Sequence, residues 1–166
     1  METVSIILPV YKARQDWLDQ CLASIKAQTY PVELIRVDGI KGAWKARNEG
    51  LKKATGEYVA FCDADDYMDP YAIEKMVKAM DGVEMVCGSF KKFGNFNMTV
   101  SGTGKLSSQE VADYVMENML NPRSNQMLSG CWAKLYRRGI MGKFPDMATA
   151  EDMAFNFDCL TRCDSV

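Results

Sequence analysis

Hydrophobic and polar positions follow two alternating patterns in the first part of the chain. Short apolar runs rich in branched and aromatic residues are typical of buried strands, and three occur here: "TVSIILPVY", "VELIRVD" and "YVAFC". Between them, apolar residues recur at helical spacing in two longer stretches. The pattern therefore predicts the order strand, helix, strand, helix, strand.

The two predicted helices have recognisable ends. Asp16 is expected to cap the first helix. The buried face of that helix is expected to contain Trp17, Leu18, Cys21, Leu22 and Ile25. The second helix, within "GAWKARNEGLKKATGEY", is expected to stop at Gly56 in the C′ position, where glycine is favoured.

This order of elements predicts an α/β fold with a doubly wound, mostly parallel sheet flanked by helices. Ligands of such sheets bind in the crevice beyond the carboxyl ends of the strands. Tyr11, Asp38 and Asp63 fall at the carboxyl ends of the three predicted strands. We therefore expect the binding site to lie there.

Further elements are predicted after these strands. Asp69 and Pro70 are expected to begin a helix that closes at Gly82, and "VEMVCGSF" is expected to form a strand. Glycine and asparagine residues within "KKFGNFNMTVSGTGK" indicate a hairpin.

Ser107 and Glu110 have the spacing of a capping box, which predicts a helix that runs to about Leu120. After a loop, "NPRSNQMLSG", we expect a short strand or helical turn and a last helix that starts near Glu151. No internal repeat or linker interrupts these elements, so residues 1–166 are predicted to form a single domain.

Composition narrows the possible functions. The chain is 48% hydrophobic and 25% charged, with a net charge of −2 and scattered basic residues, which argues against a nucleic-acid partner. No apolar run is long enough for a membrane span and no signal-peptide pattern opens the chain, so a cytoplasmic location is expected. The six cysteines lack a CxxC pair and are expected to be reduced.

The chain contains no histidine. This excludes Ser-His-Asp and Cys-His catalysis as well as histidine-bound metals. Aspartate and glutamate remain as the natural general bases and metal ligands.

An acidic group, Asp63, Asp65 and Asp66, follows the third predicted strand in "YVAFCDADDYMDP". Carboxylates in this arrangement suit a divalent cation such as Mg²⁺ or Mn²⁺, but aspartates at strand ends are also common in ordinary turns. An EF-hand loop is excluded because Met68 stands where glycine is required. A phosphatase of the haloacid-dehalogenase type stays open, although Tyr67 departs from the "DxDx(T/V)" pattern.

Four segments in this order resemble glycosyltransferase family two, the inverting nucleotide-sugar transferases of the GT-A fold. They are "VSIILPVYKARQDWLDQCLASIKAQTY", "ARNEGLKKATGEYVAFCDADDYMDP", "CWAKLYRRGIM" and "AEDMAFNF". The resemblance implies a GT-A type, Rossmann-like fold with a nucleotide-binding half at about 1–70 and an acceptor-side half at about 71–166. It implies a metal-dependent hexosyltransferase that uses a nucleotide-diphosphate sugar, with a UDP-sugar favoured, and a glycan, lipid-linked or other hydroxyl acceptor.

Donor-binding residues are carried over from the same resemblance. Pro9 and Tyr11 would lie along the nucleotide base, and Asp38 would hydrogen-bond the base. Arg47 would approach the nucleotide, although an exposed helix charge is an equal alternative from the sequence.

The resemblance also implies the metal site. Asp63 would bind ribose and a divalent metal, Mn²⁺ or Mg²⁺, and Asp65 would be the main metal ligand. Asp66 is a further candidate for contact with sugar or metal.

The implied general base is Asp152 in the pair Glu151-Asp152, which opens the last predicted helix. Two acids at this place are also explained by the positive end of the helix dipole. Trp132 is a candidate platform for sugar on the acceptor side, with a core tryptophan as the alternative.

The chain departs from the family pattern in two places. Arg47 follows Asp38 by only nine positions, so one helix and one strand of the nucleotide-binding half are expected to be absent or shortened. The chain also ends soon after the predicted last helix. A catalytically weak nucleotide-sugar or cation-binding module therefore remains an alternative to an active transferase.

Overall fold

The structure, a computed structural model, describes residues 2–91, 97, 98, 107, 109, 110, 113, 117, 130–163 and 166. Its elements, in chain order, are β1 (Val4–Val10), α1 (Gln15–Lys26), β2 (Val32–Asp38), α2 (Ala43–Lys53), β3 (Tyr58–Phe61), α3 (Ala72–Ala79), β4 (Met85–Cys87), β5 (Phe90–Lys91), β6 (Asn97–Met98), β7 (Lys134–Arg137), a 3₁₀ turn (Arg138–Ile140) and α5 (Glu151–Leu160).

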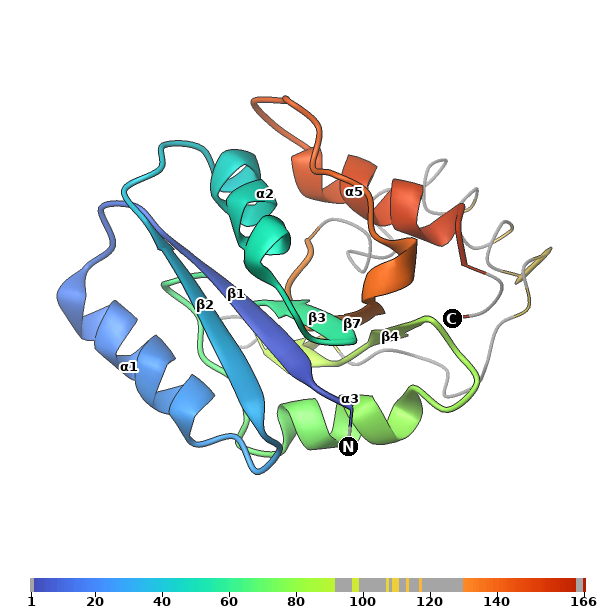
Figure 1. Cartoon of the computed structure of the whole chain (residues 1–166), viewed down its shortest axis with the longest axis horizontal. Helices are drawn as coiled ribbons and strands as arrows, with labels where there is room; N and C mark the ends of the chain where they lie inside the picture. The colour runs from blue at the N-terminus through green and yellow to red at the C-terminus, as the bar shows by residue number, and fades with distance from the viewer. Residues whose placement is uncertain are drawn as a thin grey trace.

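Five strands form the main sheet in the order β2-β1-β3-β7-β4 (Figure 1). β1 pairs in parallel with β2 and β3, and β7 pairs antiparallel with β3 and β4. Four strands therefore run in one direction, which confirms the predicted mostly parallel α/β sheet. The chain goes from β1 to β2 on one side and returns to β3 on the other, so the connection reverses between β1 and β3. Doubly wound sheets bind ligands at such a reversal.

Helices cover both faces of this sheet (Figure 1). Alternate residues of β1 point to opposite faces, as strand geometry requires. Ile6 and Leu8 pack with α1 and α3, whereas Ile7 packs with α2 and α5. β1, near the amino terminus, and α5, near the carboxyl terminus, therefore contribute to the same hydrophobic core.

The position of α2 on the sheet is closely fixed. Gly50 lies so near β1 that an added Cβ would approach Ile7 Cγ2 to 2.4 Å. On its other side, the Asn48 side chain exchanges two hydrogen bonds of 2.9 Å with the main chain of Phe144. These contacts hold α2 between β1 and the segment that leads to α5.

The connection between β2 and α2 is short. It consists of residues 39–42, in which Gly39 and Gly42 have φ angles of 77° and 100°. Glycine adopts such angles without steric cost. β2 is an edge strand of the sheet, which agrees with the expected shortening of the nucleotide-binding half.

Two expectations for α1 are wrong. The helix begins at Gln15 with Arg14 in the cap position, and the Asp16 carboxylate is bound by the Arg14 guanidinium instead of capping the helix. Trp17 does not belong to the buried face, since it is 43% exposed. The Arg14 guanidinium lies 4.4 Å from the centre of its ring, a cation–π contact that needs no burial.

The expected helix end at Gly56 is also wrong, because α2 ends at Lys53 with Ala54 as its cap. Gly56 instead lies against β1, where its amide donates a 2.9 Å hydrogen bond to Ser5 Oγ. At α3, the Asp69 carboxylate accepts a hydrogen bond from the Tyr71 amide, but the helix begins only at Ala72. The predicted start at Pro70 is therefore two residues early.

The hairpin and the capping box are confirmed where the structure describes them. β5 pairs antiparallel with β6. The Ser107 amide donates to Glu110 Oε2 at 2.8 Å, and the Glu110 amide lies 3.4 Å from Ser107 Oγ. The hairpin turn at 92–96, the predicted end of the helix near Leu120 and the loop at 121–129 lie outside the described residues. Within the described part of the chain, no helix is long and apolar enough to span a membrane.

Candidate active site

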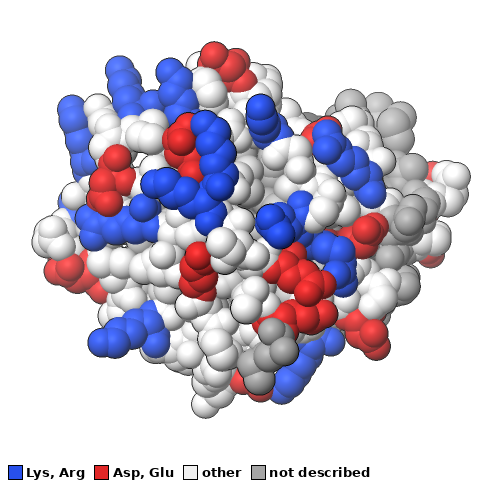
Figure 2. Space-filling view, in the orientation of Figure 1, with Lys and Arg blue, Asp and Glu red and all other residues white. Residues whose placement is uncertain are grey.

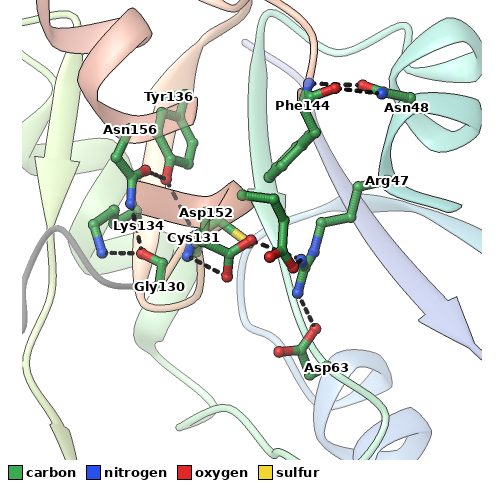
Figure 3. Close-up of polar contacts among 11 residues, drawn as sticks. Arg47, Asn48, Asp63, Gly130, Cys131, Lys134, Tyr136, Phe144, Asp152 and Asn156 are labelled. Atoms are coloured by element: carbon green, nitrogen blue, oxygen red, sulfur yellow. Dashed lines mark hydrogen bonds and ion pairs between the residues drawn. The ribbon is translucent and has the colours of Figure 1, made fainter. Parts of the chain in front are cut away.

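The guanidinium group of Arg47 joins two of the predicted site segments (Figure 3). Its Nη2 donates to Asp63 Oδ1 at 2.8 Å, and its Nη1 donates to Asp152 Oδ1 at 2.7 Å. Glu151 Oε1 lies 3.6 Å from the same Nη1. Arg47 is only 3% exposed, so the alternative that it is an exposed helix charge is wrong.

Each of these side chains is positioned by a different element. Arg47 projects from α2, which packs directly on β1. Asp63 comes after the carboxyl end of β3 and begins a tight turn, in which the Asp66 amide donates to the Asp63 carbonyl at 3.0 Å. Asp152 lies in the first turn of α5. The carboxyl edge of the sheet and the amino end of α5 therefore meet at one arginine.

Backbone strain occurs next to the predicted site residues. Among the described residues, three that are not glycine have positive φ angles: Lys12, Ala133 and Ala150. Each is the chain neighbour of a predicted site residue: Lys12 follows Tyr11, Ala133 follows Trp132, and Ala150 precedes Glu151. Such a conformation costs about 1–2 kcal/mol per residue, and it concentrates at functional sites.

Negative charge exceeds positive charge at this edge. Burial lowers the pKa of Arg47, but the carboxylates Asp63 and Asp152 outweigh this effect and raise it above its usual value. Burial raises the pKa of Asp152, and Arg47 opposes part of the rise. Partial desolvation and the charges of Asp63 and Asp65 raise the pKa of Asp66 to about 6. An additional cation would relieve this repulsion.

The acidic group fits a divalent metal only in part. Among the described residues, no group of three or more cysteine, aspartate or glutamate side chains is arranged to hold a metal ion. Asp65 is exposed and has no ion pair among the described residues, and Asp63 uses one oxygen for Arg47. Mg²⁺ and similar ions are often held by one or two carboxylates together with substrate phosphates and water. Asp63 and Asp65 match that kind of site.

The other predicted donor residues form an exposed rim. The strand register places Pro9 beside Val37, and Tyr11 and Asp38 lie at the adjacent ends of β1 and β2. Tyr11 is 43% exposed, and the Asp38 carboxylate is bound by the Arg36 guanidinium at 2.7–2.9 Å. Their contacts with a nucleotide stay predictions.

Trp132 packs against the first strand of the hairpin. The centres of the Trp132 and Phe90 rings are 4.3 Å apart, in an edge-to-face arrangement. Trp132 is partly exposed, and its predicted role as a sugar platform stays a prediction.

Sequence reasoning missed a polar network behind Asp152 (Figure 3). The Cys131 amide donates to Asp152 Oδ2 at 3.3 Å, and the carbonyl of Gly130 accepts hydrogen bonds from Lys134 Nζ and Asn156 Nδ2. Two signals were available in the sequence. Lys134 interrupts an apolar strand, and Asn156 follows Asp152 by one helical turn on the buried face of α5.

Comparisons with known proteins give the family and the fold. The profile of the family "Glycosyl transferase family 2" matches residues 31–143. Two Bacillus subtilis proteins named as glycosyltransferases, EpsH and EpsJ, are 28% and 23% identical over 95% and 98% of this chain. The chain spans only 56% and 57% of their lengths.

Solved structures show the same architecture. A crystal structure of residues 1–349 of S. aureus TarS superposes with a TM-score of 0.73 at 17% identity, over 99% of this chain and 56% of that one. TarS has been solved with UDP and with UDP-GlcNAc. The mannosyltransferase PcManGT of Pyrobaculum calidifontis, solved with GDP-Man and Mn²⁺, gives a TM-score of 0.56 at 16% identity, over 90% of this chain and 49% of that one. The fold is of the GT-A type, and the chain belongs to glycosyltransferase family 2.

Proposed function

We propose that this protein transfers a sugar from a nucleotide-diphosphate sugar to an acceptor hydroxyl, with inversion at the anomeric carbon. The observation that carries the proposal is the bridge from Asp63 through Arg47 to Asp152. One rigid guanidinium joins Asp63, which the proposal assigns to the donor side, and Asp152, which the proposal assigns to proton transfer. Membership of family 2 supports the same reaction class.

The donor would bind along the carboxyl edge of β1, β2 and β3. Pro9, Tyr11 and Asp38 would contact the base, and Asp63 would contact the ribose. A UDP-sugar is the favoured donor, because TarS, with the higher TM-score of the two solved transferases, was crystallised with UDP and UDP-GlcNAc. The acceptor would be a glycan, a lipid-linked sugar or another hydroxyl compound.

Asp65, with the free oxygen of Asp63, would hold a divalent cation, Mn²⁺ or Mg²⁺. The Mn²⁺ in PcManGT supports this assignment. When bound, such an ion neutralises the charge that develops on a departing diphosphate. Asp66 would add negative charge beside it.

Asp152 would act as the general base. It removes the proton from the acceptor hydroxyl while the bond from that oxygen to the anomeric carbon forms and the bond to the diphosphate breaks. Burial raises its pKa, which makes it a stronger base than an ordinary aspartate. Glu151 would keep the local potential negative, which also favours proton uptake.

A binding module without turnover is the second candidate, and a direct assay separates the two. The protein is incubated with Mn²⁺ and a panel of UDP- and GDP-sugars, and both thermal stabilisation and release of the nucleotide are measured. A transferase should show stabilisation and acceptor-stimulated release with at least one donor, and NMR of the product should show the inverted anomer. Stabilisation without release would indicate the binding module, and no response to any donor would contradict both. The phosphatase alternative is dropped because the family is established.

A further inference from the structure

The two oxygens of Asp152 are held by different parts of the chain. Oδ1 accepts from Arg47, and Oδ2 accepts from the Cys131 amide at 3.3 Å. Rotation of the carboxylate would break one of these bonds. The Cys131 amide belongs to an irregular turn rather than to a helix or a strand, so other groups must fix its direction.

The carbonyl of Gly130 and the amide of Cys131 belong to one peptide group. A trans peptide is planar, and its C=O and N–H bonds point in opposite directions. The Gly130 carbonyl accepts from Lys134 Nζ at 2.5 Å and from Asn156 Nδ2 at 2.9 Å. Once these two donors fix the carbonyl, the N–H on the opposite side is directed at Asp152 (Figure 3).

Lys134 is suited to this role because its charge is buried. It is 3% exposed and makes no ion pair among the described residues. A buried ammonium group requires hydrogen-bond acceptors. Among the described residues, the Lys134 ammonium donates to the Gly130 carbonyl and, at 3.4 Å, to the Trp132 carbonyl. Gly130 and Trp132 are the two chain neighbours of Cys131.

Asn156 links the same peptide back to the helix that carries the base. Its Oδ1 lies 2.6 Å from the Tyr136 hydroxyl, and this contact directs its amide nitrogen toward the Gly130 carbonyl. α5 thereby contacts both sides of the peptide, with Asp152 on the N–H side and Asn156 on the C=O side.

We propose that Lys134 is a positioning residue for Asp152. Lys134 acts on Asp152 through the peptide group between Gly130 and Cys131. A cation at the carbonyl polarises the peptide and strengthens its N–H as a donor, since linked hydrogen bonds reinforce one another. Lys134 thus stabilises the negative form of Asp152 and fixes the direction of its oxygens without contact with the substrate. The role rests on the proposed function, in which Asp152 is the base.

The test uses Lys134→Met, which keeps the length of the side chain and removes the charge, with the exposed Lys53→Met as the control. Methionine has a similar volume, and the Gly130 carbonyl keeps its hydrogen bond from Asn156, so we expect the variant to fold. With a donor that the panel identifies, kcat should fall about tenfold, the effect of one lost hydrogen bond to a charged group. The KM for the donor should stay within about twofold, because Lys134 has no hydrogen bond or ion pair with a predicted donor residue in the described part of the chain.

A double-mutant comparison separates this role from a structural one. If Lys134 acts through Asp152, Lys134→Met should lower the residual activity of Asp152→Asn by much less than tenfold, because coupled residues are not additive. A full tenfold loss in both backgrounds would contradict the proposal.

The second readout does not depend on activity. In protein labelled with ¹⁵N-cysteine, the Cys131 amide resonance should shift in Lys134→Met and in Asp152→Asn, and it should not shift in Lys53→Met. An unchanged Cys131 resonance in Lys134→Met would overturn the proposed relay even if the protein proves to be a transferase. Shifts in a protein without transferase activity would leave the relay intact and refute the proposed function.

Discussion

The two sides of the site differ in what holds their side chains. On the buried side, Arg47, Asp152 and Lys134 have protein partners at defined distances. On the rim, Tyr11, Asp38 and Asp65 are exposed. Tyr11 and Asp65 have no hydrogen bond or ion pair with another described side chain, and Asp38 is paired with the exposed Arg36. The buried side is therefore organised before any ligand arrives, as electrostatic catalysis requires, whereas in the proposed function the rim would be completed by the donor and a metal.

The largest effect is expected from Asp152→Asn, which tests whether the buried side carries the chemistry. An amide cannot take the proton from the acceptor, so kcat should fall by about 10²–10⁴. Binding of UDP, measured by calorimetry, should change little. Asp158→Asn is the matched control on α5, where Asp158 is partly exposed and paired with Arg162. Equal losses of activity in the two variants would contradict a special role for Asp152.

The pH dependence of the same reaction follows from the burial of Asp152. Its pKa is raised, and the protonated form cannot act as a base, so activity should be lost as the pH falls through that raised value. The acid limb of the profile of kcat against pH should therefore lie above the usual range for aspartate. An acid limb within that usual range would assign the proton transfer to another group.

Arg47→Met should produce the largest loss of stability, because it leaves Asp63 and Asp152 without their shared cation. Removal of one partner from a buried ion pair costs about 3–5 kcal/mol. We expect the lower end, about 3 kcal/mol, since the two carboxylate side chains are 29% and 15% exposed. Urea unfolding measures the loss.

Arg47→Lys refines this experiment. Lysine keeps the charge but has one nitrogen, so it cannot reproduce the fork that reaches both carboxylates. Its stability should lie between those of the wild type and Arg47→Met. A lysine variant as stable as the wild type would show that charge alone, without the bridge, organises the buried side.

The contrast between the buried side and the rim also explains which features could be predicted from the sequence. The spacing of apolar residues was sufficient to predict the order of the first five elements, because the side of a helix or strand that is buried is set mainly by where its apolar residues lie. It could not identify the cap of α1, because Arg14 and Asp16 bind each other instead of the helix end. The family resemblance marks Arg47, Asp63 and Asp152 as site residues, but the sequence could not show that they contact one another, since Asp152 is more than a hundred positions away from Arg47 along the chain. The role of the peptide before Cys131 could not be predicted at all, because main-chain groups carry no sequence signal.

Asp65→Asn addresses the metal on the rim. The apparent affinity for Mn²⁺ in the presence of UDP should fall about tenfold or more, because an amide oxygen is a much weaker ligand than a carboxylate for a hard cation. Stability without ligands should not decrease, since the change removes one of several repelling carboxylates. Asp69→Asn is the control, because its side-chain oxygen still accepts from the Tyr71 amide. An unchanged Mn²⁺ response would remove Asp65 from the metal site.

The smallest effect is expected from Asp38→Asn, which tests whether a rim residue contributes to donor binding without contributing to stability. The exposed pair of Arg36 and Asp38 should contribute less than about 1 kcal/mol, so unfolding should hardly change. If the carboxylate contacts the base, the KM for the donor should rise a few-fold while kcat is preserved, the pattern of a lost uniform binding interaction. Glu74→Gln, which breaks another exposed pair on α3, should change neither. A loss of stability in Asp38→Asn would mean that the rim, like the buried side, is held by the protein before the donor binds.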